Sequence, residues 1–592
     1  MDKLPREVLV LINSYLDVPT RISYIRVCKY VYSVVNQALC QHLTLTSPDQ
    51  FDKVFVAFKQ QKEKRHQVSS LQLFGCDLDV FTLLSLPDLF PNLKRLVLDS
   101  TIVNSLCYHR SLRQFEKLKN LERLDIIIRN GFNFTVALFS STTLAKLTYL
   151  KIKGIENMAE SIRTVVDNIA KIPALTTLEL EDFLIGLDDL ELIDNGLKNL
   201  TKLVLKKVHF INKPSIRIIT RGETAILMDR DGKECTIQPN SVLRSFYMSK
   251  LQIQNSPGSG ALKKKLDSLI QYVTLKYSSL DSLTLEATYL DGGRIYPVHS
   301  FQQNILDLIS RMSNLTHYAI QLEPLSDSVT HAIEQNENMK LKSIDVRVDG
   351  RAIEIQFTNM IKPCYTNTIE SLRIKDIANQ FRPNFHYTDY MIYHITQFKH
   401  LTKLELDTTE MCGHDYGFLV NIIQKMPNLN TLALGKFTCD PIIYPTFNIN
   451  AIARSNIKNL KLGLVVRRKG TRSLINDIFK FCIKSCPYLV DFEVIGKLHC
   501  NWGNINLDFR NNLHIQSLKV DIKGCLFYTF NALSFGSDVL EPYSQYKVPL
   551  SYSIPYLDPS LPTPPDLKGY FFVNILSDKY ISFSLAEPKI KI

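Results

Sequence analysis

Hydrophobic positions recur along most of the chain in one short pattern, L-x-x-L-x-L, in which x is usually polar. Typical copies are LKNLERLDI at 118–126, IPALTTLEL at 172–180 and FKHLTKLEL at 398–406. The last three positions alternate apolar, polar and apolar, which predicts a short strand with one buried face. The first position of the pattern falls at residues 68, 93, 121, 147, 175, 200, 280, 315, 341, 369, 401, 429, 457, 489 and 515, and most intervals are 25–32 residues.

Between these strands the apolar spacing changes to that of amphipathic helices, as in NMAESIRTVVDNIAKI and DYGFLVNIIQKM. Several helical patterns end at a proline just before the next strand, at Pro91, Pro173, Pro427 and Pro487. One strand and one helix cannot bury both their apolar faces alone, but stacked copies can. The pattern therefore predicts an α/β solenoid, with a curved parallel sheet inside and helices outside.

These units resemble leucine-rich repeats over roughly residues 68–521. The resemblance implies a repeat solenoid whose concave sheet face holds partners. The Asn or Cys that usually follows the strand by three residues occurs here only as Cys76, and Thr101, Arg129 and Phe183 stand at equivalent places. A regular ladder of side-chain hydrogen bonds after the strands is therefore not expected.

The first helical pattern is apolar on two sides. Leu4, Val8, Leu11, Ile12 and Tyr15 share one face, and Leu9 with Leu16 lies on a second. A helix at the edge of a globular protein normally buries one stripe. The pattern alone leaves two interpretations of equal weight: both sides are buried within this chain, or one side is covered by a separate polypeptide.

The same stretch, LPREVLVLINSYLD followed by RISYIRVCKYVY, resembles an F-box over about residues 2–46. The resemblance implies that this segment binds a Skp-type adaptor and, through it, a cullin–RING ubiquitin ligase. The adaptor-binding residues that the resemblance implies are Leu4, Pro5, Glu7, Val8, Leu9, Leu11, Ile12, Tyr15, Leu16, Val27 and Cys28.

The fold class expected is therefore α/β, with an all-helical F-box before the leucine-rich-repeat solenoid. The expected parts are 2–46 as F-box, 47–205 and 280–521 as two halves of the repeats, 206–279 as an irregular insertion, and 522–592 as a proline-rich tail or cap. LRSFYM at 243–248 is interpreted as a degenerate copy. Hairpins are predicted around Asp231-Gly232 and Ser577-Asp578, and a mobile loop at QNSPGSGALKKKLDS.

Composition and charge exclude several classes. The 592 residues carry a formal charge of +12, a mild excess that does not indicate a nucleic-acid partner. The sequence contains no apolar stretch of 18 residues, so no membrane span is predicted. Asp2, Arg6 and Glu7 argue against a secretory signal. The 12 cysteines form no CxxC pair, and Cys482 and Cys486 are interpreted as core residues. A cytoplasmic or nuclear location is expected.

The sequence carries no motif for catalysis, a metal or a cofactor, so none is expected. Charged residues that flank the apolar strand positions are predicted to face outward and to contact a target protein through mixed charges. These target-binding candidates are Arg123, Asp125, Glu179, Glu181, Lys202, Lys206, Arg373, Lys375, Glu405 and Asp407. Their signs come in blocks, basic near 200 and 373 and acidic near 180 and 405.

The sequence favours a non-catalytic substrate-recognition subunit of an SCF-type ubiquitin ligase, with an unknown target. The alternative is a leucine-rich-repeat scaffold that uses its F-box-like helices internally and has no link to ubiquitin.

Overall fold

The structure is a computed structural model. It describes residues 8–9, 30–32, 41–76, 78–99, 102–103, 111–127, 136, 138–140, 144–154, 162–210, 217–221, 224–228, 234–253, 259–287, 302–322, 325–348, 360, 363–376, 386–407, 416–439, 454–466, 472–498, 503–509, 512, 514–523, 527–533, 570–576 and 582–585. The chain divides into two compact units, residues 1–315 and 316–592, which are described separately below.

Unit 1 contains a parallel sheet to which each repeat adds one strand. Its strands are β1 (His42–Leu45), β2 (Ser70–Phe74), β4 (Arg95–Asp99), β6 (Arg123–Ile126), β7 (Tyr149–Lys153), β8 (Thr177–Glu181), β10 (Lys202–Lys206), β15 (Ser245–Ile253) and β16 (Ser282–Ala287). Successive strands in this order pair with each other in parallel. The predicted stack of parallel strands is confirmed.

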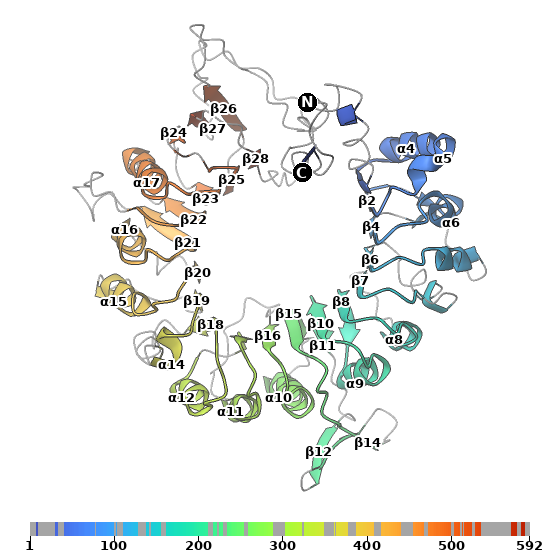
Figure 1. Cartoon of the computed structure of the whole chain (residues 1–592). Coiled ribbons are helices and arrows are strands. Elements are labelled where there is room, and N and C mark those ends of the chain that lie inside the picture. The colour runs from blue at the N-terminus through green and yellow to red at the C-terminus, as the bar shows by residue number, and fades with distance from the viewer. Residues whose placement is uncertain are drawn as a thin grey trace. The chain divides into compact units, whose positions relative to one another are not determined.

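Helices cover one face of this sheet (Figure 1). They are α4 (Pro48–Gln60), α5 (Lys62–Arg65), α6 (Val80–Leu89), the 3-10 helix η1 (Ser111–Lys117), α8 (Ile162–Ile169), α9 (Leu187–Gly196), α10 (Ser259–Lys276) and α11 (Gln302–Arg311). In α4, Ser47 caps the N-terminus by accepting a hydrogen bond from the Gln50 amide, and Pro48 fits the first turn. We call the opposite, uncovered face of the sheet in each unit its open face.

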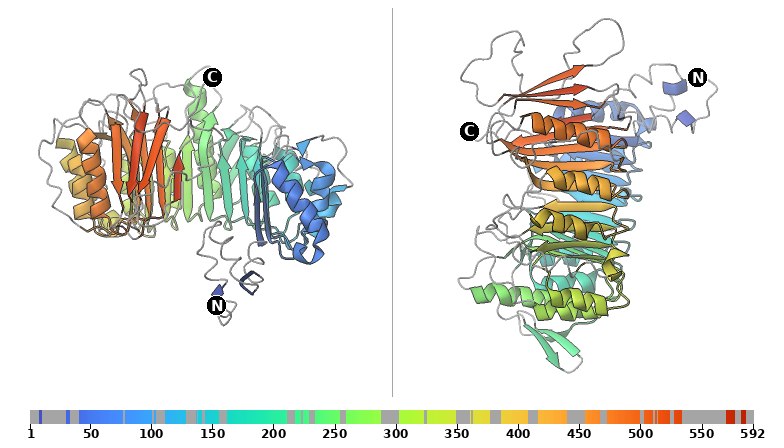
Figure 2. Two further views of the ribbon diagram at one scale, coloured as in Figure 1. Left: turned by 90° about the horizontal axis from the view of Figure 1, so that it is seen from above. Right: turned by 90° about the vertical axis from the view of Figure 1, so that its left-hand side faces the viewer.

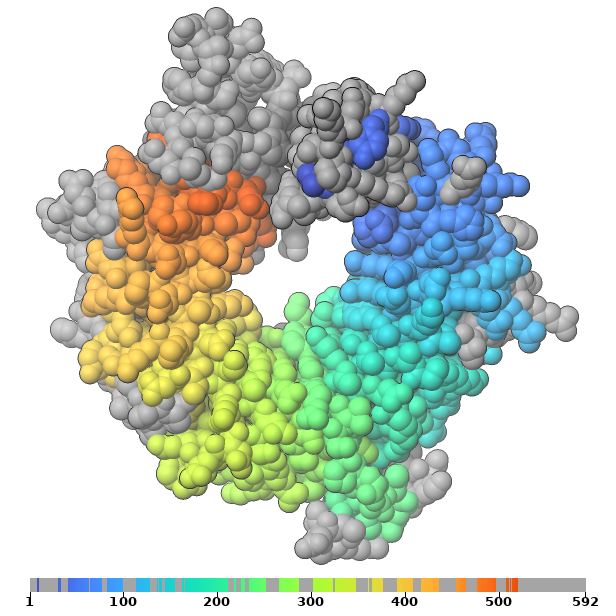
Figure 3. Space-filling model, in the orientation of Figure 1, coloured from blue at the N-terminus to red at the C-terminus, as the bar shows by residue number. Residues whose placement is uncertain are grey.

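The leucines of the repeat pattern form columns across the sheet. The register aligns Leu124, Leu150, Leu178, Leu203, Phe246 and Leu283 on neighbouring strands. All six are fully buried beneath the helices. Burial of one such side chain contributes about 1.5–3 kcal/mol, so the repeated columns supply the main stabilisation of the unit. In the space-filling view the repeats of each unit form a close-packed layer (Figure 3).

Unit 2 repeats this arrangement. Its sheet strands are β17 (His317–Ile320), β18 (Ser343–Val348), β19 (Ser371–Asp376), β20 (Lys403–Asp407), β21 (Thr431–Cys439), β22 (Asn459–Val466), β23 (Asp491–Leu498), β25 (Ser517–Lys523) and β28 (Ser582–Leu585). Its helices are α12 (Asp327–Gln335), α14 (Pro363–Thr366), α15 (His386–Ile395), α16 (Tyr416–Lys425) and α17 (Arg472–Ser485). Figure 2 shows these strands side by side, with α16 and α17 on one face. Cys482 and Cys486 are buried within α17 and its turn, as predicted.

Most repeats lack the asparagine that usually follows the strand, so the sequence predicts no regular ladder of side-chain hydrogen bonds there. In unit 1 a ladder of backbone hydrogen bonds follows the strands instead. The amides of Gly154, Asp182 and Lys207 each donate to a carbonyl of the following repeat, at 2.7–3.0 Å. Asp182 and Lys207 adopt left-handed backbone conformations at the same repeat position as Gly75. The turn brings chains close enough for short second strands to pair, β9 (Leu184–Ile185) with β11 (His209–Phe210). Cys76, the one residue that fits the usual pattern, donates its thiol to the Leu45 carbonyl of the preceding repeat.

Part of the predicted irregular insertion is regular. β15 lies between β10 and β16 in the sheet, and α10 occupies much of the segment predicted as a mobile loop. The degenerate copy at 243–248 is therefore a repeat strand. Outside the sheet, β12 (Arg217–Arg221), β13 (Thr224–Met228) and β14 (Glu234–Thr236) form a small antiparallel sheet, and β13 and β14 flank the predicted turn at Asp231-Gly232 (Figure 1).

The predicted boundary between F-box and repeats is too late by one strand. β1, at residues 42–45, already pairs with β2, because its Leu45 continues the buried column at Leu73. The repeat sheet therefore begins inside the segment assigned to the F-box.

The predicted C-terminal hairpin is wrong. β27 (Tyr570–Leu576) lies between β24 (Gly503–Asp508) and β26 (Phe527–Leu533) in a separate parallel sheet. β28 instead pairs in parallel with β25 at the end of the repeat sheet. The edge of β25 offers unpaired backbone groups, and covering it satisfies them. The C-terminal segment thus contributes a capping strand, one of the two roles expected for it.

A buried polar network joins α9 to α10 where the small antiparallel sheet is inserted. Glu191 pairs with Lys276 at 2.8 Å and accepts the Tyr272 hydroxyl at 2.7 Å. Asp194 accepts the Tyr277 hydroxyl at 2.7 Å and the Asn240 amide at 3.1 Å. Lys276 therefore pairs with Glu191, while Asp194 is held by neutral hydrogen-bond donors.

Burial raises the pKa of Asp194 to about 6, although hydrogen bonds from Tyr277 and Asn240 and the charge of Lys276 act in the opposite direction. The raised pKa means that the folded chain holds a proton here that the unfolded chain releases above about pH 4.

We predict that Gly154→Ala destabilises unit 1. A Cβ at this position would lie 2.5 Å from the Asp182 carbonyl oxygen, a backbone atom that cannot move without breaking the ladder. The expected cost is about 1–3 kcal/mol, measured as a lower urea midpoint. Lys198→Ala, at an exposed position of the same unit, is the control. An unchanged midpoint for Gly154→Ala would contradict this close packing.

We also predict a pH-dependent contribution from Asp194. Its stabilising effect is complete below about pH 4 and is lost as the pH rises through about 6, because the folded pKa lies above the unfolded one. The difference over this window is about 3 kcal/mol. In Asp194→Asn this dependence should disappear from urea unfolding measured between pH 4 and 7. Asp281→Asn, whose side chain is half-exposed, should keep it; equal slopes in all three proteins would refute the assignment.

Candidate functional site

The predicted target-binding residues lie on the open faces of the two units. In β6, Arg123 and Asp125 alternate with the buried Leu124 and Ile126, and the same alternation holds in β8, β10, β19 and β20. Because successive strand residues point to opposite faces, the charged set lies opposite the helices. The prediction of which face these residues occupy is correct.

Glu179 is the centre of the charge network in unit 1. Its carboxylate accepts hydrogen bonds from Lys206 Nζ at 2.8 Å and from the Tyr149 hydroxyl at 2.9 Å, and it pairs with Lys151 at 2.8 Å. Burial alone would raise its pKa, but the hydrogen bonds from Lys151, Lys206 and Tyr149 outweigh that effect and lower the pKa to about 2. Glu179 is therefore ionised and fully engaged within the chain.

Two further carboxylates, those of Glu181 and Asp182, lie at the end of β8. Glu181 pairs with Lys151 at 3.4 Å and with Lys207 at 3.3 Å, and Asp182 lies 3.9 Å from Lys207. The neighbouring Lys153 contacts both carboxylates. Burial by itself would raise the pKa of Glu181, but these lysines lower it. The acidic strand thus lies between basic strands on both sides.

Toward the first repeats, Asp125 is buried between two guanidinium groups. Arg123 Nε donates to its carboxylate at 3.1 Å, and Arg95 lies at 3.9 Å. The Arg123 guanidinium also stacks 3.9 Å above the ring of Tyr149, which carries the network across to β7.

The open face of unit 2 has its own network. Arg373 lies between two carboxylates, 3.5 Å from Asp345 and 3.1 Å from Glu405, and Lys403 pairs with Glu405 at 2.7 Å. Lys375 donates to Gln321 at 2.8 Å, and Gln321 in turn donates to Asp345. Charges of opposite sign therefore alternate from strand to strand.

The charge blocks predicted near residues 180, 200, 373 and 405 each lie on one strand, β8, β10, β19 and β20. The parallel register sets acidic and basic side chains of adjacent strands opposite one another, so most of them neutralise each other within the chain. Of the ten candidates, Lys202 and Asp407 are the two that are exposed. The others are half-buried or buried, and their first role is to order the face.

Sequence reasoning missed several members of these networks, among them Tyr149, Lys151 and Lys153. A signal was present, since Lys151 occupies the same place in its repeat as Asp125 and Glu179. Aligning the copies by strand position, rather than scanning for blocks of one sign, would have found them.

Of the predicted adaptor-binding residues, the structure describes Val8 and Leu9. Both are helical; Leu9 is fully buried, whereas Val8 is 38 % exposed. Tyr30–Tyr32 are also helical, with Val31 buried and the two tyrosines exposed. The other predicted contacts lie outside the described residues: Leu4, Pro5, Glu7, Leu11, Ile12, Tyr15, Leu16, Val27 and Cys28.

Two further features are absent from the described part of the chain. No group of three or more His, Cys, Asp or Glu side chains there is placed to hold a metal ion. Among the same residues, no helix has the length and apolar character needed to cross a bilayer.

Comparisons with known proteins give likenesses only among solved structures. No protein-family model matches the sequence, and no curated protein matches it either. A leucine-rich-repeat protein from Leptospira interrogans is similar over 76 % of this chain and 91 % of its own, with 15 % identity and a TM-score of 0.33. An internalin from Listeria monocytogenes is similar over 73 % and 88 %, with 13 % identity and a TM-score of 0.27. The repeat architecture described above rests on the strand registers and the buried leucine columns of this chain.

We predict that Glu179→Gln destabilises unit 1, because it leaves Lys151 and Lys206 without their shared carboxylate on a half-buried surface. The expected loss is about 1–3 kcal/mol, measured as a lower urea midpoint at pH 7. Glu122→Gln, which removes an exposed pair with Lys94, is the matched control and should change little. Equal midpoints for the two variants would contradict a structural role for the network.

Proposed function

We propose that this protein is the non-catalytic substrate-recognition subunit of an SCF-type ubiquitin ligase. In this proposal residues 2–46 act as an F-box that binds a Skp-type adaptor, and an open face of the repeats holds a target protein. The chain contributes proximity rather than bond chemistry, since simultaneous binding raises the concentration of target lysines near the ligase. Such a complex would act in the cytoplasm, the nucleus or both.

The proposal rests on one observation: some apolar side chains of the N-terminal segment are buried and others are exposed. Leu9 and Val31 are covered by the chain itself, whereas Val8, Tyr30 and Tyr32 are 38–47 % exposed. Val8 stands within the Leu-Pro-x-Glu-Val-Leu sequence that resembles the F-box. A helical segment that buries one side and leaves apolar groups open on another is suited to a protein partner.

The open faces support a protein target over a nucleic acid. Acidic and basic side chains alternate between neighbouring strands, as at Lys151, Glu179 and Lys206. A nucleic-acid backbone requires one sign of charge along its path. A protein can instead match a mixed surface by its own charges, which gives specificity.

The alternative is a protein-binding repeat scaffold with no link to ubiquitin. It is favoured by one observation: β1 follows the N-terminal segment directly and pairs with β2. A helical segment so close to the first strand can serve as the cap that a solenoid needs, with Leu9 and Val31 as its buried contacts.

We predict that Val8→Glu weakens binding of a Skp-type adaptor at least about tenfold, because it places a charge at the centre of an apolar contact. Val56→Glu is the matched control: Val56 is also an exposed apolar side chain, 53 % accessible, but lies on α4 outside the F-box-like segment. Co-purification of the adaptor with the full chain, followed by calorimetry, measures the difference.

Deletion of residues 1–40 distinguishes the ligase proposal from the scaffold alternative, because it removes the N-terminal helical segment and keeps the residues of β1. Loss of the adaptor with an unchanged urea midpoint supports the ligase assignment. Failure of the full chain to bind any Skp-type adaptor, together with a destabilised deletion variant, supports the scaffold.

A further inference from the structure

Asparagine side chains bridge successive repeats at the edge where the sheet strands begin. The residue before the first apolar position of the pattern is an asparagine in six described repeats, at 92, 120, 199, 314, 428 and 456. Four of them, Asn92, Asn199, Asn428 and Asn456, donate their amides to a backbone carbonyl of the preceding repeat at 2.7–3.4 Å. Each of these hydrogen bonds links two successive repeats.

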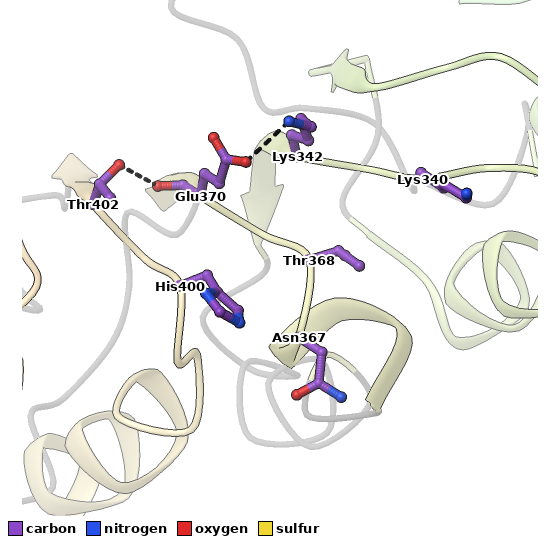
Figure 4. Close-up of a pocket in the computed structure, with 7 residues that line it drawn as sticks. All are labelled: Lys340, Lys342, Asn367, Thr368, Glu370, His400 and Thr402. Atoms are coloured by element: carbon purple, nitrogen blue, oxygen red, sulfur yellow. Dashed lines mark hydrogen bonds and ion pairs between the residues drawn. The ribbon is translucent and has the colours of Figure 1, made fainter.

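In three consecutive repeats of unit 2, other residues take the place of these asparagines. The equivalent positions before β18, β19 and β20 hold Lys340, Thr368 and His400. A hollow of about 460 Å³ opens at this edge of the sheet, lined also by Lys342, Asn367, Glu370 and Thr402 (Figure 4). The hollow therefore lies where the asparagine bridges are missing.

The hollow has an excess of positive charge. Lys342 Nζ pairs with Glu370 at 3.1 Å, and the Thr402 hydroxyl donates to the Glu370 carbonyl at 3.1 Å (Figure 4). Glu370 is the one carboxylate among the lining residues, and that pair neutralises it. Lys340 has no ion-pair partner within the described residues, so Lys340, Lys342 and Glu370 together leave a net charge of +1.

The hollow contains more hydrogen-bond donors than the carboxylate of Glu370 can accept. Besides the two lysines, the Asn367 amide and the His400 ring line the same hollow (Figure 4). A phosphate monoester presents three terminal oxygens and a charge near −2, so it can use several donors and match the charge. Lysine ammonium groups bind such a dianion by short charge-assisted hydrogen bonds.

We propose that this hollow, formed by Lys340, Lys342, Asn367, Thr368 and His400, is a binding site for a phosphate monoester. The site does not depend on the ligase assignment, because it lies on the strand-start edge of unit 2 and uses none of the residues given to the adaptor. Phosphate can reach it as the free ion or as part of a phosphorylated protein segment.

The test is fluorescence anisotropy with the full chain and a labelled Ala-Gly-phosphoserine-Gly-Ala peptide, with inorganic phosphate as competitor and the unphosphorylated peptide as reference. Binding should be saturable and phosphate-dependent. Lys340→Gln should weaken it about tenfold, the typical effect of one charge-assisted hydrogen bond. Lys458→Gln is the matched control, since Lys458 is exposed at the repeat position equivalent to Lys342 but lies outside the hollow. Thr368→Glu, which adds a negative charge inside it, should abolish binding.

Tighter binding of the phosphopeptide than of inorganic phosphate would assign the site to phosphorylated protein segments, and equal affinities would assign it to the free ion. The proposal is overturned if neither probe binds saturably, or if Lys340→Gln and Thr368→Glu bind as the wild type does. Because the substituted side chains are solvent-accessible, urea midpoints should stay unchanged in every variant.

Discussion

The structure depends on one repeated contact: a leucine of each strand packs against the leucine at the same register position of the next strand. No single repeat can bury its apolar face, because a strand and a helix together expose as much as they cover. Stacking removes that exposure at every repeat boundary. In both units the columns are continuous enough that aromatic residues replace leucine without breaking them, as at Phe246 and Phe492.

The same register governs the polar side of the sheet. Once the leucines are aligned, the intervening residues of neighbouring strands are also aligned, and their charges face one another at hydrogen-bonding distance. The open face is therefore an ordered network, in which Glu179 and Arg373 each link strands on both sides. A partner that binds there meets a fixed pattern of charge with little side-chain freedom left to lose. Such preorganisation lowers the cost of association.

Departures from the repeat mark the places where this chain is distinctive. The small antiparallel sheet β12–β14 enters between two regular repeats, and buried carboxylates on α9 hold the adjoining helix α10. At the strand-start edge of unit 2, a basic hollow lies beside three repeats that have no bridging asparagine. At the N-terminus, apolar side chains remain exposed beside buried ones.

The sequence alone determined the repeat, its strand positions and the burial of its leucines, because these follow from a local periodicity that every copy shares. It also identified which residues face outward, and it predicted the turn between β13 and β14. The pairing of Lys151 with Glu179, the entry of β1 and β28 into the repeat sheet, and the backbone ladder through Asp182 and Lys207 were decided by tertiary structure. Each depends on which segments become neighbours across tens of residues, and the local pattern of a single segment carries no information about its neighbour.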